Sequence, residues 1–273
     1  MSSISPAIPA HVELVSTFTG VTFPAEWYEI NSKEHFWFTW RVEAMKCLMR
    51  SVSLPASEPL RAIDVGCGTG VLRDQIEAFT AWKIDALDLN LAALSRSQPG
   101  RGRTLYYDVV ERRAEFLGMY DVAILFDVIE HIDHPHEFLQ AVLQHLKPGG
   151  WILINVPALE ACRSRFDTAV GHLRRYTLPQ LAEAARRADI AVRDVRYWGF
   201  SMVPLLILRK FYFKLRPSGD DAAIVQRGLR PPGALANTLL KQIMWIETAL
   251  LQHPPLGSSL LLAGQFGKRA DKL

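Results

Sequence analysis

Residues 62–70 read AIDVGCGTG, and the interpretation of the whole chain starts from this stretch. An apolar segment that begins at Leu60 leads into a turn with alternating glycines, Gly66, Gly68 and Gly70. Glycine lets the backbone bend tightly and lets another group approach closer than any side chain would permit. Helical sequence follows from Val71. The stretch therefore predicts a buried strand, a turn suited to binding and a helix, in that order.

The remaining sequence repeats this alternation of strand and helix. Further strands are expected at residues 82–87, 104–107, 121–126, 151–156, 190–197 and 258–266. Helices are expected at 36–52, 71–79, 135–146 and 178–188, the last one opened by the capping-box pattern Thr177-x-x-Gln180. Strands that alternate with helices and lack hairpin turns indicate a parallel sheet covered on both faces. We expect an α/β, doubly wound fold with a seven-stranded, mostly parallel sheet.

The alternation ends near residue 198, which suggests a division of the chain into four parts. We expect an N-terminal arm with a cap helix at 1–55 and a Rossmann-like core at 56–197. Residues 217–233 are rich in turn formers and 235–251 are again helical, so 198–256 are interpreted as a helical lid or insertion. The final strand and a tail make up 257–273.

Composition limits the class of protein. The 273 residues are 49% hydrophobic and 22% charged, which fits one globular domain with additions. A net charge of +3 without a concentrated basic stripe argues against nucleic acid as a partner. The three cysteines, Cys47, Cys67 and Cys162, are widely spaced and form no C-x-x-C motif, so we expect neither a disulfide framework nor a zinc site.

The same cysteine usage fits a reducing compartment, and the expected localisation is cytoplasmic. Residues 1–10 have no basic segment followed by an apolar run, and the longest apolar run, Met202–Leu208, is too short to span a bilayer. Basic residues follow this run at Arg209, Lys210, Lys214 and Arg216. Packing of a core helix explains the pattern, and the alternative is a weak contact with a membrane surface or the admission of an apolar substrate.

Acidic residues follow two of the expected strands at informative distances. Asp88 lies 20 residues beyond Gly68, where an acid at the end of the second strand can hold both hydroxyls of a ribose. Asp108 follows the next strand and can accept from an exocyclic amine such as that of adenine. The dinucleotide fingerprint requires a small residue where this chain has Val71, and the chain contains no Tyr-x-x-x-Lys pair. A nicotinamide-dependent oxidoreductase is therefore the alternative rather than the main interpretation.

The series of motifs resembles class I S-adenosylmethionine-dependent methyltransferases. The resemblance covers residues 58–158 and includes the glycine turn with Asp64, Asp88, the turn at 107–109, the segment DVIEH at 127–131 and the loop LKPGG at 146–150. A Glu-His pair at 130–131 is similar to quinone-pathway O-methyltransferases (the UbiG- and UbiE-like branch, methyltransferase types 11 and 12). The flanks at 35–38 and 171–176 are similar to a bacterial branch of the family whose substrates are mostly undefined.

The resemblance implies a set of residues that bind S-adenosylmethionine. Asp64 and the turn residues Gly66, Cys67, Gly68 and Gly70 would lie at the methionine end, with the backbone of Asp127 beside it. The ribose, the adenine amine and the purine ring would be held by Asp88, Asp108 and the pair Leu89 and Val109. Arg41 is a candidate for the methionine carboxylate, since a guanidinium binds carboxylates bidentately; the alternative is a solvated helix charge.

The acceptor side is predicted from the segments that flank the motifs. If the acceptor is a hydroxyl, a base must remove its proton, and His131 and then His172 are the candidates. The alternative is that each histidine only hydrogen-bonds a loop. Residues expected near the acceptor are Trp37, Phe38, Arg174, Arg175 and Tyr176, although the aromatic ones could simply pack the helix and the arginines could be surface charge.

The crowded segment 130–136, with two acids and three histidines, could suggest a metal. Asp133 is more simply a helix cap and the segment lacks a spaced partner group, so we expect no metal. The predicted function is methylation of a small molecule, apolar or acidic, most readily at the oxygen of a hydroxyl or carboxyl group. A non-catalytic protein that binds the cofactor is a further alternative, and a monomer or homodimer is expected.

Overall fold

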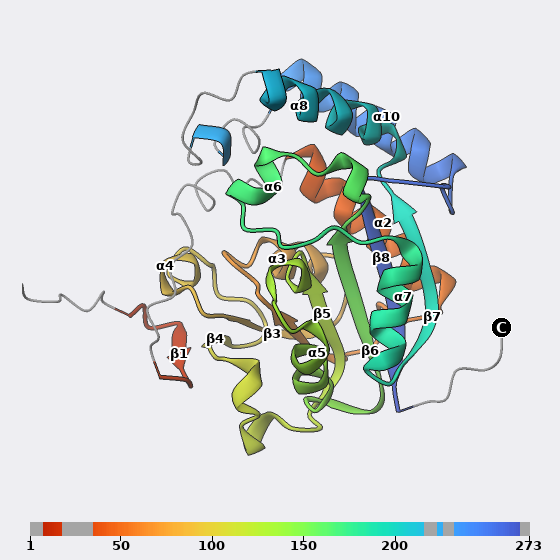
Figure 1. Cartoon of the computed structure of the whole chain (residues 1–273). Helices are drawn as coiled ribbons and strands as arrows, with labels where there is room; N and C mark the ends of the chain where they lie inside the picture. The colour runs from red at the N-terminus through yellow and green to blue at the C-terminus, as the bar shows by residue number, and fades with distance from the viewer. Residues whose placement is uncertain (1–7, 18–34, 216–222, 226–231, 268–273) are drawn as a thin grey trace, which may run out of the picture.

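The computed structural model describes residues 8–17, 35–215, 223–225 and 232–267, and within these ranges the strands form one eight-stranded sheet. Along the sheet they follow the order β1-β4-β3-β2-β5-β6-β8-β7 (Figure 1). Their bounds are β1 Val12–Leu14, β2 Arg61–Val65, β3 Lys83–Asp88, β4 Thr104–Tyr106, β5 Tyr120–Phe126, β6 Leu146–Pro157, β7 Ile190–Trp198 and β8 Ser259–Phe266. Neighbours from β1 to β6 are parallel, and β8 is antiparallel to β6 and β7.

Helices follow most of the parallel strands. They are α2 Phe36–Ser51, α3 Val71–Glu77, α4 Leu91–Leu94, α5 Pro135–Leu143, α6 Arg165–Ala169, α7 Leu178–Arg187, α8 Val203–Leu215 and α10 Ala234–Leu250. Short 3-10 turns link them, η1 Val109–Glu111, η2 Ala114–Phe116, η3 Ile129–His131, η4 Glu160–Cys162 and η5 Phe200–Met202. The helix opened by the capping box at Thr177 and Gln180 is present as α7.

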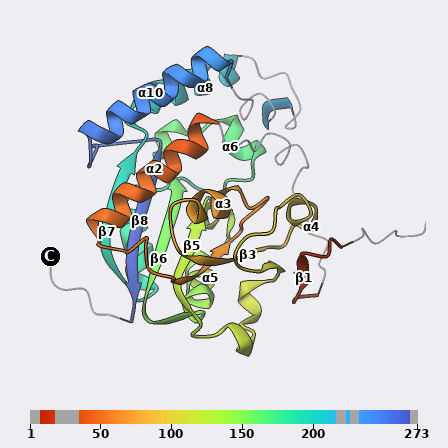
Figure 2. The ribbon, with the colours of Figure 1, turned by 180° about the vertical axis from the view of Figure 1, so that it is seen from behind.

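Both faces of the sheet are buried, as the doubly wound class requires. In β5, Ala123 and Leu125 belong to the apolar cluster that includes residues of α5 and α7, whereas Val122 and Ile124 belong to the cluster with α2 and α3. This alternation follows from the two-residue period of a strand. Figure 1 shows α5 and α7 before the sheet, and Figure 2 shows α2 and α3 on its other side. The expected fold class is confirmed.

The strand order reverses between β2 and β5. The chain runs from β2 outward to β3 and β4, then returns to place β5 on the other side of β2. In open α/β sheets ligands bind beyond the carboxyl ends of the strands at such a point. Residues that follow β2, β3, β4 and β5 are therefore brought to one crevice.

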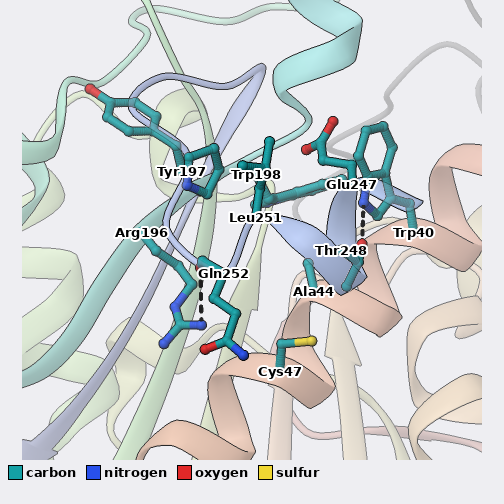
Figure 3. A pocket seen from close by; sticks show the side chains of 11 residues that line it. Trp40, Ala44, Cys47, Arg196, Tyr197, Trp198, Glu247, Thr248, Leu251 and Gln252 are labelled. Carbon is teal, nitrogen blue, oxygen red and sulfur yellow. Dashed lines mark hydrogen bonds between the residues drawn. The ribbon is translucent and has the colours of Figure 1, made fainter. Parts of the chain in front are cut away.

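Three helices lie at the same end of the molecule as the start of α2, namely α6, α8 and α10 (Figures 1 and 2). Two hydrogen bonds join α10 to α2: Trp40 Nε1 donates to Thr248 Oγ1 at 3.1 Å, and the amide of Phe36 donates to Asn237 Oδ1 at 2.9 Å. Figure 3 shows the first of these bonds, at the interface between the two helices. A cavity of about 20 Å³ lies there, which is large enough for one water molecule.

The prediction of seven strands was wrong by one. β1 has only three residues, of which Val12 alone is buried, so it carried no detectable periodicity, yet it pairs in parallel with β4. β6 also begins earlier than expected, because Leu146 pairs with Tyr120 across a register shift. The division into four parts stays a prediction. Residues 1–7 and 18–34 of the predicted arm, 216–222 and 226–231 of the predicted lid, including Arg216, and 268–273 of the predicted tail lie outside the described residues. No helix in the described part is long and apolar enough to cross a membrane.

Candidate active site

The turn between β2 and α3 depends on glycine at three positions, and at Gly66 it leaves no room for a side chain. Gly66, Gly68 and Gly70 all have left-handed φ values, of 74°, 56° and 77°. A Cβ atom at Gly66 would lie only 2.8 Å from Cγ2 of Val128. The amide of Gly66 donates to the carbonyl of Leu87 at 2.8 Å, which ties the turn to β3. Glycine is therefore needed for both conformation and space.

Asp88, at the end of β3, contacts this turn directly. Its Oδ2 accepts from the amide of Gly68 at 2.8 Å, and its Oδ1 accepts from the amide of Asn90 at 2.8 Å. Burial raises the pKa of Asp88, against the lowering effect of these two backbone donors. The acid is thus held rigidly at the edge of the crevice, while its remaining lone pairs stay available.

A cavity of about 510 Å³ occupies the crevice, a volume typical of small-molecule sites. Nearly all predicted cofactor residues line it: Arg41, Asp64, Gly66, Cys67, Gly68, Asp88, Leu89, Asp108, Val109 and Asp127. Gly70 is not among the lining residues, and instead occupies the N-cap position of α3. The sequence thus anticipated which strand ends meet in this cavity.

Asp64 is the most conspicuous polar group of the cavity wall. The residue is 1% exposed, and its Oδ2 has no hydrogen-bond partner among the described residues. Burial raises the pKa of Asp64 to about 7, although the positive charges of Arg41 and Arg73 oppose the shift. A buried carboxylate oxygen without a partner is costly, so a cationic group in the cavity would be stabilised here.

Arg41 of α2 is paired with a protein carboxylate. Its Nη1 donates to Asp127 Oδ2 at 2.7 Å, and Asn155 Nδ2 donates to Asp127 Oδ1 at 2.6 Å. Trp198 Nε1 in turn donates to Asn155 Oδ1 at 2.9 Å. Asp127 is held by these contacts in a left-handed conformation, with φ of 61°, unusual for a residue other than glycine. The predicted role of Arg41 toward a ligand carboxylate stays a prediction, since Asp127 occupies one of its nitrogens.

Asp108 is positioned by the turn that follows β4. Its Oδ1 accepts from the amide of Val110 at 2.9 Å, and its own amide donates to Ser16 Oγ at 2.9 Å. Val109 is 2% exposed and lines the cavity together with Leu89, which follows β3. That these apolar side chains enclose the purine ring stays a prediction.

His131 and His172 both line the cavity, and their ring centroids are 5.0 Å apart. Nδ1 of His131 lies 3.1 Å from the carbonyl of Gly171 and must donate to it, because a carbonyl only accepts. Burial, followed by the influence of His172, lowers the pKa of His131 to about 4. His131 is therefore a weak base at neutral pH.

His172 has a different environment, because a carboxylate orients its ring. Nδ1 of His172 donates to Asp167 Oδ1 at 3.0 Å, which leaves Nε2 with the lone pair. Burial would raise the pKa of Asp167, but the hydrogen bond from His172 and the charge of Arg175 hold it below its usual range. Arg175 Nε donates to the same oxygen at 2.7 Å and its Nη1 donates to the carbonyl of Ala158 at 2.8 Å. The ionised Asp167 therefore fixes the tautomer of His172.

Glu130 is next to these histidines and is fully buried. Neither of its carboxyl oxygens has a hydrogen-bond partner in the described part of the chain. Burial and then the charge of Asp127 raise the pKa of Glu130 well above its usual range. Among the described residues, Glu130, His131 and His172 form a group whose metal-ligating atoms all lie within 4.8 Å of one another. A metal would first have to displace the proton of Glu130, and the expectation of a metal-free site stays a prediction.

The predicted acceptor residues divide into two sets. Trp37, Phe38 and Arg175 line the cavity. Arg174 and Tyr176 are not among the lining residues: Arg174 donates to the carbonyl of Asp133 at 3.3 Å, and Tyr176 is 5% exposed. Phe166 of α6 and Val170, which caps that helix, line the cavity and were missed by sequence reasoning. Met202, Leu206 and Arg209 also line it, and they belong to the segment for which admission of an apolar substrate was the alternative.

Comparison with known proteins gives one family match. A profile described as a methyltransferase domain matches residues 39–195. Over 102 residues, 36% of this chain, the sequence is 31% identical to a protein of Caulobacter sp. (strain K31) named ubiquinone biosynthesis O-methyltransferase. The match spans 40% of the length of that relative.

Solved structures with low sequence identity share the fold. The [4+2]-cyclase SpnF has a TM-score of 0.53 at 18% identity, with 83% of this chain and 80% of that chain covered. Phosphoethanolamine N-methyltransferase 2 of Haemonchus contortus, solved in complex with S-adenosyl-L-methionine, has a TM-score of 0.51 at 17% identity. That alignment covers 82% of this chain and 52% of the nematode chain. At these identities the likeness concerns the fold alone.

Proposed function

This chain belongs to the methyltransferase domain family, and from that premise we propose that it transfers a methyl group from S-adenosylmethionine to an oxygen of a small molecule. The observation that carries the proposal is a set of three acids at the carboxyl ends of β2, β3 and β4, around one cavity. Asp64, Asp88 and Asp108 all line it, beside a turn in which Gly66 leaves no room for a side chain. The O-methyltransferase name of the Caulobacter relative supports oxygen as the methylated atom.

The charge of the cavity suits this cofactor. S-adenosylmethionine supplies a methyl group on a positively charged sulfonium and also carries an ammonium group. Asp64 Oδ2 is buried and unpartnered, so it can accept from the ammonium. Asp88 can accept from the ribose hydroxyls, because the two backbone donors leave lone pairs on its oxygens. Leu89 and Val109 would then enclose the purine.

The oxidoreductase alternative fits the same cavity less well. A nicotinamide dinucleotide carries a dianionic pyrophosphate, which at the glycine turn would lie near the carboxylate of Asp64. The small residue that this cofactor needs at the start of the helix is replaced by Val71, which lines the cavity. Electrostatics and shape therefore both favour a cationic nucleoside.

For a hydroxyl acceptor, we assign the general base to His172 rather than to His131. His172 lines the cavity, its Nε2 lies 3.9 Å from Glu130 Oε1, and Asp167 would stabilise the imidazolium that forms when Nε2 takes up a proton. His131, with its pKa lowered to about 4, would gain little from accepting a proton. Its ring instead contacts His172 edge to face and limits how that ring can turn.

The other lining residues position the acceptor and exclude water. Phe38, Phe166 and Leu206 supply apolar walls from three different helices. Methyl transfer is an in-line displacement, for which alignment and exclusion of water provide much of the rate. Arg209, stacked on Phe166 with its guanidinium carbon 4.3 Å from the ring centroid, can pair with an acidic group on the acceptor.

Calorimetry with S-adenosylhomocysteine tests the cofactor assignment. We expect saturable binding tighter than about millimolar and a loss of at least tenfold in Asp88→Ala, since two charge-assisted contacts to the ribose disappear. Glu115→Ala, on the exposed turn η2, is the matched control and should bind normally. Tighter binding of NADH than of S-adenosylhomocysteine would overturn the proposal in favour of an oxidoreductase.

Turnover is tested with cell extract and isotopically labelled S-adenosylmethionine, followed by untargeted mass spectrometry. The labelled product identifies the acceptor, and His172→Gln should then lower kcat by about 10²–10⁴-fold while His131→Gln lowers it much less. Normal cofactor binding without any labelled product would favour a non-catalytic, cofactor-binding protein. A loss confined to His131→Gln would reverse our assignment of the base.

A further inference from the structure

Helices α8 and α10 expose an unusual amount of apolar surface. On α8, six outward side chains are between 41% and 80% exposed: Leu205, Ile207, Leu208, Phe211, Tyr212 and Leu215. On α10, the outward apolar side chains are Leu235, Leu239, Ile243, Trp245, Ile246 and Leu250, with Trp245 at 74% and Leu235 at 90%. We call these twelve residues the apolar face. Single exposed apolar residues are ordinary, but a cluster of this kind marks an interaction site.

The inner side of each helix packs against the rest of the protein. On α8, Leu206 and Arg209 line the cavity and Phe213 is buried with Phe166. On α10, Met244 packs against the cluster with α2 and Thr248 bonds Trp40 (Figure 3). With 3.6 residues per turn, the inner and outer residues fall on opposite sides of both helices. The apolar face is therefore not needed to hold α8 and α10 in place.

The exposed charge on these helices is basic. Of their four basic residues, Arg209 lines the cavity and Lys210 donates to the carbonyl of Ala161, which leaves Lys214, exposed, and Lys241, half-buried. Their one acid is Glu247. Glu247 is 7% exposed and turned inward, where its carboxylate accepts from the amides of Gly199, Phe200 and Ser201. Lys214 is exposed at the margin of the apolar face. Apolar side chains, an outward Trp and Tyr, and basic margins without exposed acids are the features of interfacial helices.

We propose that the apolar face seats the protein on an anionic lipid bilayer, with α8 and α10 lying in the plane of the interface. The positive margins complement anionic headgroups, whereas a second copy of this chain would bring the same positive charges together. Neither helix is long and apolar enough to span a bilayer, which fits helices that lie flat. The inference does not depend on methyl transfer, because it concerns the outer side of these helices alone.

Docking in this way has a consequence for the cavity. Since the inner side of α8 contributes Leu206 and Arg209 to the cavity wall, a bilayer against its outer side lies one helix diameter away, about 10 Å. An amphipathic acceptor dissolved in the bilayer could then reach the cavity without crossing water. The apolar face would bind the bilayer in which such an acceptor dissolves, and the apolar walls of the cavity would bind the acceptor itself.

Vesicle co-sedimentation tests the proposal with the full chain. The probes are vesicles of phosphatidylcholine and vesicles in which roughly a third is phosphatidylglycerol, at low and high salt. We expect the wild type to bind the anionic vesicles and to release partly at high salt. The pair Leu208→Asp and Trp245→Asp, combined, should lower the partition coefficient at least tenfold. Lys214→Gln should lower it about fivefold on anionic vesicles only.

The control is Leu117→Asp, because Leu117 is 41% exposed at the end of η2, outside α8 and α10 and outside the cavity lining, and this variant should bind vesicles like the wild type. Thermal unfolding and S-adenosylhomocysteine binding verify that each variant is folded, and substitutions at exposed positions should change neither. Absence of wild-type binding to anionic vesicles would overturn the proposal. So would a concentration-dependent dimer in light scattering that Leu208→Asp and Trp245→Asp abolish, since the face would then join two copies.

Discussion

Replacement of Gly66 by alanine gives a quantitative test of how the glycine turn works. Gly66 has φ of 74°, and this left-handed conformation costs a residue with a Cβ atom about 1–2 kcal/mol. The new Cβ would also lie 2.8 Å from Val128 Cγ2, and overpacking of this kind costs about 1–3 kcal/mol. We therefore expect Gly66→Ala to lower the free energy of unfolding by about 2–5 kcal/mol in total.

Gly118 provides a matched control for the conformational part. Its φ is 62°, and a Cβ atom there would have no neighbour within 4 Å. Gly118→Ala should therefore cost only about 1–2 kcal/mol. Urea unfolding followed by circular dichroism measures both variants, and an unchanged m-value verifies that the denatured state is comparable.

The clash with Val128 can be isolated in a double-mutant cycle. Combining Gly66→Ala with Val128→Ala should recover about 1–3 kcal/mol relative to the sum of the single effects, because the methyl that blocks the new Cβ is gone. Calorimetry should show at least tenfold weaker binding of S-adenosylhomocysteine to Gly66→Ala and normal binding to Gly118→Ala. Equal stability losses in the two glycine variants, or no coupling with Val128, would refute the account of the turn.

Three further predictions concern the ionisation of Asp64, a bound metal and the hydrogen bond that joins α2 to α10. Burial raises the pKa of Asp64 from 3.8 to about 7, so the native state holds an extra proton between these values and its stability falls as pH rises through them. Asp64→Asn should flatten that fall, which is at most about 4 kcal/mol, while weakening cofactor binding; urea unfolding across pH and calorimetry measure the two effects. Excess EDTA should leave turnover unchanged, whereas loss with EDTA and recovery with Mg²⁺ would assign a metal to Glu130, His131 and His172. Thr248→Val should lower the free energy of unfolding in urea by about 1 kcal/mol, because it removes the hydrogen bond from Trp40. An unchanged free energy would mean that this bond does not hold α10 against α2.

Much of the fold follows from local patterns. The glycine turn, the acid at Asp88 and the run of buried strands all depend on short stretches whose period or spacing is visible in the chain. The bond from Gly68 to Asp88 joins residues that are 20 positions apart, a separation fixed by one helix and one strand. A strand-helix-strand unit of this length permits few arrangements, so sequence reasoning could place its residues at one crevice.

Other features depend on contacts that no local pattern reveals. β1 is a strand only because β4 pairs with it, since three residues with one buried side chain have no readable period. Asp167 belongs to a five-residue helix with a capping box of its own, and nothing in the sequence shows that it faces His172. The same is true of Glu130, whose burial depends on how the segments after β5 and β6 close over it.

The two halves of the cavity therefore differ in origin. The cofactor half consists of residues at strand ends, and sheet topology alone brings them together. The acceptor half consists of residues on α2, α6 and α8 and on the connections after β5 and β6, and long-range bonds hold these in place. Leu173 donates to the carbonyl of Glu130 at 2.9 Å, and Lys210 donates to that of Ala161 at 2.7 Å. A substitution in α6 or α8 can therefore alter the acceptor wall without touching the strand ends. Selectivity for the acceptor is accordingly expected to respond to changes at Phe166, Leu206 and Arg209 while affinity for S-adenosylhomocysteine stays constant.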